Sequence, residues 1–246
     1  MRKLIILAAL AVVWSSCQHK QTGLTYRTEY ITVDSATADA TRDMDYVAYM
    51  APIKAFMDSE MGIILGYCAD ELWIDSTENP MLNWTADVLL KKAQEVCPFK
   101  VHISIQNTGG ARAPWTIGKL KLGDVFKTMP FNNRMVVLQM KGSTILKLFG
   151  NLAPKERAHG IAGIRVAVKH KELVSIEIDG QPVDPDAVYG VATSNYLAKG
   201  KDGMLELKTR DTLWDSELLI RDIYIEAIRE QDTVHAAVDG RWTIEK

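Results

Sequence analysis

Several features are scarce or absent in this sequence of 246 residues, and each absence excludes a class of protein. After the first residues, no apolar run approaches the ~20 residues that a membrane-spanning helix needs. Acidic and basic residues nearly balance, at a net charge of −2, and no basic run is present. We therefore expect no nucleic-acid partner. Only three cysteines occur, and their spacing is not that of a metal site.

The amino-terminal residues predict export. Arg2 and Lys3 precede a short apolar run at residues 4–13, and Trp14-Ser-Ser-Cys17 follows it. Small residues directly before a cysteine resemble the processing site of bacterial lipoproteins. We therefore expect a signal peptide at residues 1–16 and a membrane anchor through lipid on Cys17, on the periplasmic or surface face of the cell envelope. An ordinary secretory signal with a cysteine nearby is the alternative.

The rest of the chain predicts a polar tether followed by one folded domain. Residues 17–42 are polar and rich in Thr, whereas helical periodicity and alternating apolar runs begin at Asp43. Strands and helices mix without strict βαβ alternation, so we expect one α+β domain at residues 43–246, with a mixed β-sheet and flanking helices. Predicted helices are 46–57, 82–96, 122–128, 144–152 and 218–229; predicted strands are 61–67, 101–105, 134–140, 164–168, 173–178 and 189–193.

Short signals set some boundaries within this domain. Asn83 is a candidate cap for the helix at 82–96, and Ser143 is a candidate cap for the helix at 144–152. Asp179-Gly180 predicts a hairpin turn between two apolar runs. In an exported protein, Cys68 and Cys97 could form a disulfide. Their apolar neighbours favour two separate buried thiols.

Asn107-Thr-Gly-Gly-Ala-Arg112 is the first candidate for a binding site. It follows the predicted strand at 101–105. Gly109 and Gly110 would let the backbone approach a ligand closely and adopt positive φ. The Asn107 amide can donate and accept at the edge of a nucleobase, and the Arg112 guanidinium suits a phosphate. Alone, the pattern also fits a plain structural turn.

Two later segments complete the candidate set. Met129-Pro-Phe131-Asn-Asn133 precedes the predicted strand at 134–140, where an aromatic residue would ordinarily be part of the core. Asn195-Tyr196-Leu-Ala-Lys-Gly-Lys-Asp202-Gly203 follows the strand at 189–193. Asp-Gly is common in turns, but the Asp202 carboxylate could also accept hydrogen bonds from two ligand hydroxyls.

Together these three segments resemble the C-terminal, substrate-binding domain of the 5'-nucleotidase family, over about residues 43–242. The resemblance implies that Phe131 and Tyr196 stack on the two faces of a nucleobase, with help from Asn133, and that Asn107 contacts the base. It further implies that Asp202 contacts the ribose and Arg112 the phosphate end of a nucleoside or 5'-nucleotide. A family loop that lies under the base resembles His159-Gly-Ile-Ala-Gly163.

The chain departs from the family pattern at three positions. Thr108 and Lys201 replace glycines, and Tyr196 replaces a phenylalanine. If residue 201 needs positive φ, a lysine there is strained or the loop is remodelled. The family often adds an arginine from the preceding helix, where this chain has Lys91 and Lys92; they could serve as point charges or simply form a solvated helix face.

The two-metal catalytic centre of the family has no counterpart in the sequence motifs. Such a centre needs several Asp, His and Asn ligands. The five histidines are isolated, and no Gly-x-Ser-x-Gly, Walker or Cys-His nucleophile motif appears. We therefore expect no catalytic residue, metal or other cofactor in this chain. Divalent metals are expected on a separate metallophosphatase chain, with the helix around Tyr46, Tyr49 and Met50 as a candidate contact surface.

Three functions remain open on the sequence. The first is the recognition part of a split 5'-nucleotidase in nucleotide catabolism, which is inactive alone. The second is a non-catalytic surface lipoprotein that binds nucleosides or nucleotides. The third is a domain of the same family whose ligand has changed, for example to a cyclic nucleotide or a nucleotide sugar. A metallophosphatase gene beside this one would favour the first, and its absence would favour the second.

Overall fold

The computed structural model describes residues 28, 30 and 43–245. The predicted signal peptide, Cys17 and nearly all of the tether lie outside the described residues. The chain divides into two units, residues 1–50 and 51–246. Helix α3 (Met44–Met61) confirms the helix predicted from residue 46, and none of its residues is buried.

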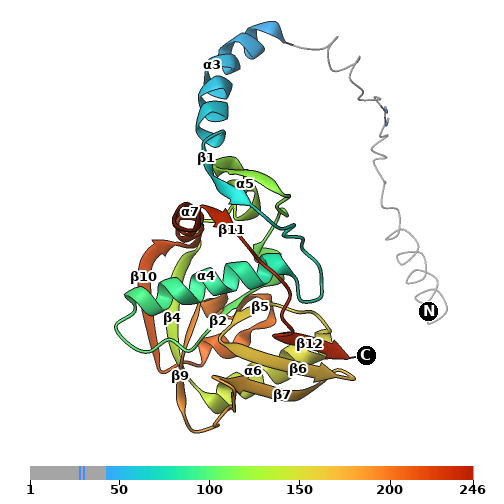
Figure 1. The fold of residues 1–246 in the computed structure, drawn as a ribbon, viewed down its shortest axis with the longest axis vertical. Helices are drawn as coiled ribbons and strands as arrows, with labels where there is room; N and C mark the ends of the chain where they lie inside the picture. Colours follow the sequence, from blue (N-terminus) through green and yellow to red (C-terminus); the bar gives the residue numbers. More distant parts are fainter. Residues whose placement is uncertain (1–27, 29, 31–42, 246) are drawn as a thin grey trace, which may run out of the picture. The chain divides into compact units, whose positions relative to one another are not determined.

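The second unit is built on a mixed five-stranded sheet in the order β10-β4-β9-β2-β5. β9 runs parallel to β2 and antiparallel to β4, and the two edge strands are antiparallel to their neighbours. A mixed sheet with flanking helices confirms the α+β prediction (Figure 1). The strands are β2 (Ile103–Gln106), β4 (Arg134–Lys141), β5 (Gly160–Ala162), β9 (Val188–Ser194) and β10 (Thr212–Leu219).

Each face of this sheet carries its own core, because side chains alternate along β4. Val136, Leu138 and Met140 belong to one apolar cluster, and Met135 and Val137 belong to the other. The first cluster includes α6 (Gly142–Leu152), and the second includes α4 (Pro80–Val96) and α7 (Ile220–Gln231). The sheet is therefore covered on both faces, which fixes the positions of its strand ends.

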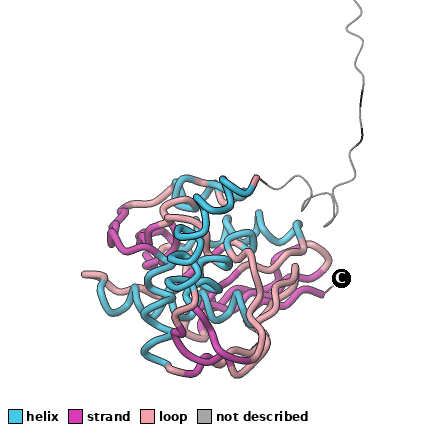
Figure 2. Tube along the Cα trace, turned by 90° about the horizontal axis from the view of Figure 1, so that it is seen from above, coloured by secondary structure: helices cyan, strands magenta, loops and turns pink. Residues whose placement is uncertain are grey.

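Two smaller sheets extend the unit. One of them consists of β12 (Trp242–Glu245), β6 (Ile164–Lys169), β7 (Glu172–Ile178) and β8 (Gln181–Pro182). Figure 1 shows β12, β6 and β7 near the carboxyl end of the chain, where Figure 2 also shows strands. β11 (Thr233–Val234), β1 (Ile64–Cys68) and β3 (Gly118–Lys121) form the other, and α5 (Leu122–Thr128) follows β3 directly.

Both predicted helix caps are wrong. Helix α4 begins two residues earlier than predicted, and the Asn79 side chain caps it by accepting from the Leu82 N–H at 3.0 Å. Asn83 lies inside the helix and donates to Glu78. Helix α6 begins at Gly142, and its N-cap residue, Lys141, makes no side-chain cap bond. Both helices begin before the first residue predicted for them: α4 at Pro80, a residue that the first helical position tolerates, and α6 at Gly142.

The Asp179-Gly180 turn forms as predicted, but it joins a different pair of strands. Both residues have positive φ, as a tight hairpin turn requires, and they connect β7 to β8. The apolar run at 189–193 instead enters the five-stranded sheet as β9. Cys68 and Cys97 are separate free thiols, as the apolar neighbours suggested, but only Cys68 is buried and Cys97 is half-buried. Burial raises the pKa of both.

Candidate functional site

One end of the five-stranded sheet gathers three chain segments. β2 and β9 are parallel, so the loops after Gln106 and Ser194 leave the sheet at the same end. β4 is antiparallel to β9, and its second residue, Met135, pairs with Ser194, so the segment before β4 arrives there too. Loops at the carboxyl ends of strands are common ligand sites because a rigid sheet positions them.

These segments surround one cavity of about 190 Å³. The eight residues that line it are the eight predicted to bind a ligand: Asn107, Gly109, Gly110, Arg112, Phe131, Asn133, Tyr196 and Asp202. The structure thus brings the predicted set together. That these residues bind a nucleotide stays a prediction.

The first loop holds the Asn107 side chain over two glycines. Residues Thr108–Gly110 form a single 3₁₀ turn, closed by a hydrogen bond of 2.9 Å from the Gly110 N–H to the Asn107 carbonyl. A Cβ on Gly110 would lie 2.9 Å from the amide oxygen of Asn107. Neither Gly109 nor Gly110 has positive φ. Gly110 is therefore needed for close approach to the Asn107 side chain, whereas a Cβ on Gly109 would make only an ordinary contact, at 3.6 Å from the Asn107 amide nitrogen. The expectation of positive φ was wrong for both.

Arg112 and Phe131 form one wall of the cavity. The Arg112 N–H donates to the Thr128 carbonyl at 2.9 Å, which ties the first loop to the end of α5, just before Phe131. The guanidinium carbon of Arg112 lies 5.2 Å from the centre of the Phe131 ring. This distance is within the range of cation–π attraction. Arg112 therefore lies against the aromatic ring that was predicted to stack on a base.

The loop after β9 supplies another part of the lining, through Tyr196 and Asp202. Asn195 pairs with Arg134 at the start of β4: its N–H donates to the Arg134 carbonyl at 2.9 Å, and its side-chain oxygen accepts from the Arg134 N–H at 3.2 Å. The carbonyl of Asn133, the residue before Arg134, accepts from the Ile220 N–H. Tyr196 and the Phe131–Asn133 segment are thereby held at the same end of the sheet.

Asp202 joins the two loops. One carboxylate oxygen accepts from the Tyr196 hydroxyl at 2.9 Å, and the other accepts from the Asn107 side-chain amide. A phenol is protonated at neutral pH and can donate; the hydrogen bond to Asp202 raises the pKa of Tyr196 further. Asp202 itself has φ +54°, whereas Lys201 does not have positive φ. The strained position in this loop is therefore Asp202, and the lysine is accommodated.

A family model described as 5'-nucleotidase, C-terminal domain, matches residues 68–209. The chain belongs to this family. It is 27% identical over 138 residues to the UshA protein of Yersinia enterocolitica, across 54% of this chain and 25% of that protein. It is 30% identical over 184 residues to the trifunctional nucleotide phosphoesterase YfkN of Bacillus subtilis, across 68% of this chain and 12% of that protein.

Solved structures agree with this assignment. The 5'-nucleotidase precursor from Thermus thermophilus superposes with a TM-score of 0.72 at 25% identity, over 82% of this chain and 43% of that one. The chain thus spans a quarter or less of the two relatives above and under half of the solved structure.

The structure gives a role to Thr108, which replaces a family glycine. Its hydroxyl donates to the Ala158 carbonyl at 2.5 Å, and its N–H donates to Nδ1 of His159 at 3.4 Å. His159 is only 8% exposed and meets the edge of Trp242 at a ring separation of 5.6 Å. The His159–Gly163 segment therefore supports the first loop from behind and does not line the cavity.

Burial controls the protonation of His159. It lowers the pKa of the imidazole to about 4, and the positive charges of Arg157 and Lys155 act in the same direction. The neutral ring can then offer Nδ1 as an acceptor to the Thr108 N–H. The sequence drew attention to the His159–Gly163 segment only through its resemblance to a family loop. It did not reveal the contact with Thr108, which links positions far apart in the chain and carries no motif.

Arg221 on α7 is a second support that the sequence did not reveal. Its guanidinium carbon lies 4.2 Å from the centre of the Phe126 ring, and its Nη2 donates to the Asn132 side chain at 3.0 Å. The side chain is buried and does not line the cavity. Arg221 therefore supports the Phe131 segment through Asn132, the residue that follows Phe131.

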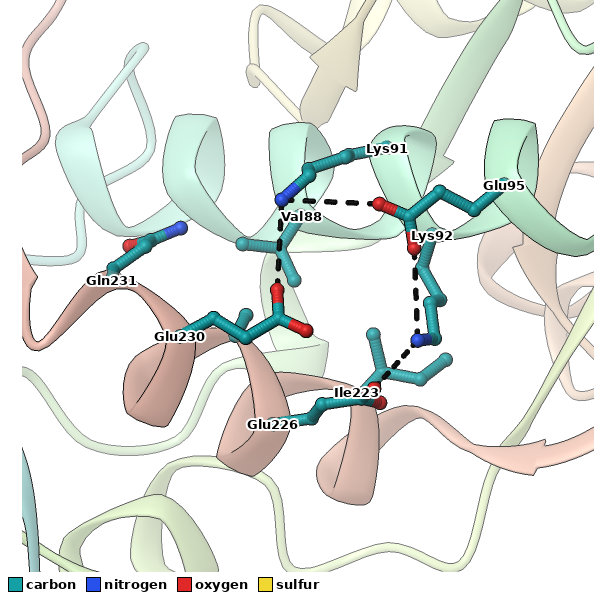
Figure 3. Close-up of a pocket in the computed structure, with 9 residues that line it drawn as sticks. Val88, Lys91, Lys92, Glu95, Ile223, Glu226, Glu230 and Gln231 are labelled. Atoms are coloured by element: carbon teal, nitrogen blue, oxygen red, sulfur yellow. Dashed lines mark hydrogen bonds and ion pairs between the residues drawn. The ribbon is translucent and has the colours of Figure 1, made fainter.

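Lys91 and Lys92 lie away from the site. Figure 3 shows both lysines of α4 facing the acidic side chains of α7. Lys92 pairs with Glu226 at 2.8 Å, and Lys91 lies 3.6 Å from Glu230. They form a charged surface between two helices and supply no charge to the cavity.

Two further findings concern membranes and metals. Among the residues described, none of the helices combines the length and apolar character needed to cross a membrane. In the same part of the chain, no three His, Cys, Asp or Glu side chains are grouped so that they could hold a metal ion.

Proposed function

We propose that this chain is the nucleotide-recognition part of a 5'-nucleotidase. One observation carries the proposal: the eight residues predicted to contact a nucleotide line a single cavity. A base would stack between Phe131 and Tyr196, the ribose hydroxyls would donate to Asp202, and Arg112 would face the phosphate. Membership in the family supports these roles.

Ligand entry requires a local rearrangement. The cavity of about 190 Å³ is smaller than the ~300–1,000 Å³ of ordinary small-molecule sites. The Arg112 guanidinium lies against Phe131, where a base would stack. It is exposed and carried on a long side chain, so it can leave the ring at small cost. Its movement toward the phosphate would open the space for the base.

Hydrolysis, in this proposal, is performed with a separate metallophosphatase chain that holds the divalent metals. Ile53, Phe56 and Met57 of α3 are exposed large apolar side chains, as are Tyr46 and Tyr49. Large apolar residues that gather on an exposed surface often mark a protein interface. The exposed side chains of α3 are therefore the surface we assign to the metallophosphatase partner.

We also propose that the protein is exported and anchored by lipid on Cys17. The support is the arrangement of Arg2, Lys3 and the apolar run before Cys17. Metabolic labelling with a fatty-acid analogue should mark the parent and not Cys17→Ser, and the parent should fractionate with membranes. Unlabelled parent protein would contradict the anchor and leave the recognition function untouched.

The test of the recognition function combines release and binding. We expect the chain with manganese to bind 5'-AMP and release no phosphate. Addition of a metallophosphatase that lacks its own C-terminal domain should produce release that depends on this chain. Tyr196→Ala should reduce it. Release by the chain alone that chelation abolishes would contradict the split enzyme, whereas binding with no release under any condition would favour a capture protein.

A further inference from the structure

The Tyr196 hydroxyl makes a hydrogen bond that a phenylalanine at this position could not make. It donates to one oxygen of Asp202 at 2.9 Å, while the Asn107 amide donates to the other oxygen. The carboxylate is therefore held from both sides, by residues that follow β9 and β2. Base stacking requires only the aromatic ring, so the hydroxyl is free for a different task.

Asp202 needs such support because of where it lies. Its side chain is exposed, and its backbone occupies the left-handed region at φ +54°, between Gly200 and Gly203, which also have positive φ. An exposed carboxylate on this loop would sample several rotamers if it were unrestrained. The two hydrogen bonds select one of them before any ligand arrives.

We propose that Tyr196 is a positioning residue for sugar recognition, which fixes the Asp202 carboxylate to accept both hydroxyls of a ribose. The proposal rests on the nucleotide function above and deepens it, because it assigns the ligand class as ribonucleosides and ribonucleotides in preference to their deoxy forms.

The acceptor count of the carboxylate supports this assignment. An ionised carboxylate offers about four acceptor positions, two on each oxygen. Tyr196 and Asn107 each occupy one, on different oxygens. One position remains on each oxygen, which matches the two adjacent hydroxyls of a ribose. The aromatic ring would stack on the base while its hydroxyl orients the carboxylate, so one residue would serve both parts of a nucleoside.

The size of the effect follows from pre-organisation. Immobilising a side chain on binding lowers affinity roughly two- to tenfold, and a side chain that is already fixed avoids this loss. Tyr196→Phe keeps the aromatic face and removes only the hydroxyl. We therefore expect it to weaken the binding of adenosine roughly two- to tenfold more than the binding of 2'-deoxyadenosine or 3'-deoxyadenosine.

The experiment measures dissociation constants for adenosine and the two deoxyadenosines with four chains: the parent, Tyr196→Phe, Asp202→Asn and the double variant. The parent should prefer adenosine, and Tyr196→Phe should reduce that preference. Asp202→Asn should reduce it further, and Tyr196→Phe should then have no additional effect, because the two residues act through one hydrogen bond. Tyr189→Phe is a matched control, since that hydroxyl accepts from the Asp184 N–H instead.

The outcomes separate this inference from the function on which it rests. No binding of any nucleoside by the parent would overturn both. Binding without a preference for adenosine would overturn the inference alone. So would an unchanged or increased preference in Tyr196→Phe, because the hydroxyl would then be idle or would compete with the sugar. Circular dichroism and thermal unfolding of each variant establish that the fold is retained.

Discussion

His159 gives the stability of this protein a defined dependence on pH. Burial lowers the pKa of its imidazole from the ordinary value of 6.5 to about 4. In the unfolded chain the ring returns to its ordinary value, so the unfolded state binds a proton more readily between these two values. The gap corresponds to about 3 kcal/mol of unfolding free energy. This stabilisation is fully present above pH 6.5 and is lost as the pH falls toward 4.

The assay is urea unfolding of the parent and His159→Asn from pH 8 to pH 4. The asparagine keeps an acceptor near the position of Nδ1 and does not titrate. Between pH 6.5 and pH 4 the unfolding free energy of the parent should fall by up to about 3 kcal/mol more than that of the variant. Charged neighbours also shift the pKa of His159 in the parent: Arg157 and Lys155 lower it, and Asp202 raises it. Subtracting the variant removes the contribution of His102, whose pKa is also lowered, mainly by burial.

Parallel curves for the two proteins would refute this reasoning, because they would mean that His159 titrates alike in both states. A second readout connects the effect to the site. Protonation removes the acceptor that Nδ1 offers to the Thr108 N–H. Nucleoside affinity should therefore fall through the same pH range in the parent and less in His159→Asn.

Three further substitutions test the cavity by calorimetric titration. Phe131→Ala should weaken adenosine by ~1–3 kcal/mol through loss of stacking, and an affinity equal to the parent's would remove Phe131 from the site. Arg112→Ala should weaken 5'-AMP more than adenosine, and equal losses would contradict a phosphate contact. Gly110→Ala should weaken adenosine because the new Cβ would lie 2.9 Å from the Asn107 side-chain oxygen and displace the amide; unchanged binding would show that the Asn107 position is unimportant.

Much of the site could be predicted because its residues lie in short motifs directly after or before strands. Asn107 and Tyr196 follow apolar strands, and Phe131 precedes one. Pairing of β2, β4 and β9 then brings the three motifs to one end of the sheet. The resemblance to a family provided the roles, and the strand pattern alone would have left each motif equally compatible with a turn.

The supporting contacts could not be predicted, because they join residues with no local signal. His159 with Thr108 and Arg221 with Asn132 depend on packing between distant segments. The strain expected at Lys201 is instead at Asp202, since the path of the whole loop decides which residue has positive φ.

The sequence also could not predict which strands pair with each other. The Asp179-Gly180 turn correctly predicted a hairpin, but the sequence did not show that the short β8 would be the partner of β7. It likewise did not show that the chain would then cross to the five-stranded sheet as β9.

The most direct test of the central claim is calorimetric titration of the purified chain with adenosine and then with 5'-AMP. The account predicts saturable binding of both ligands at one site, which is weakened by Phe131→Ala and by Tyr196→Ala. Absence of binding by either ligand would contradict nucleotide recognition, although the family assignment and the fold would stand.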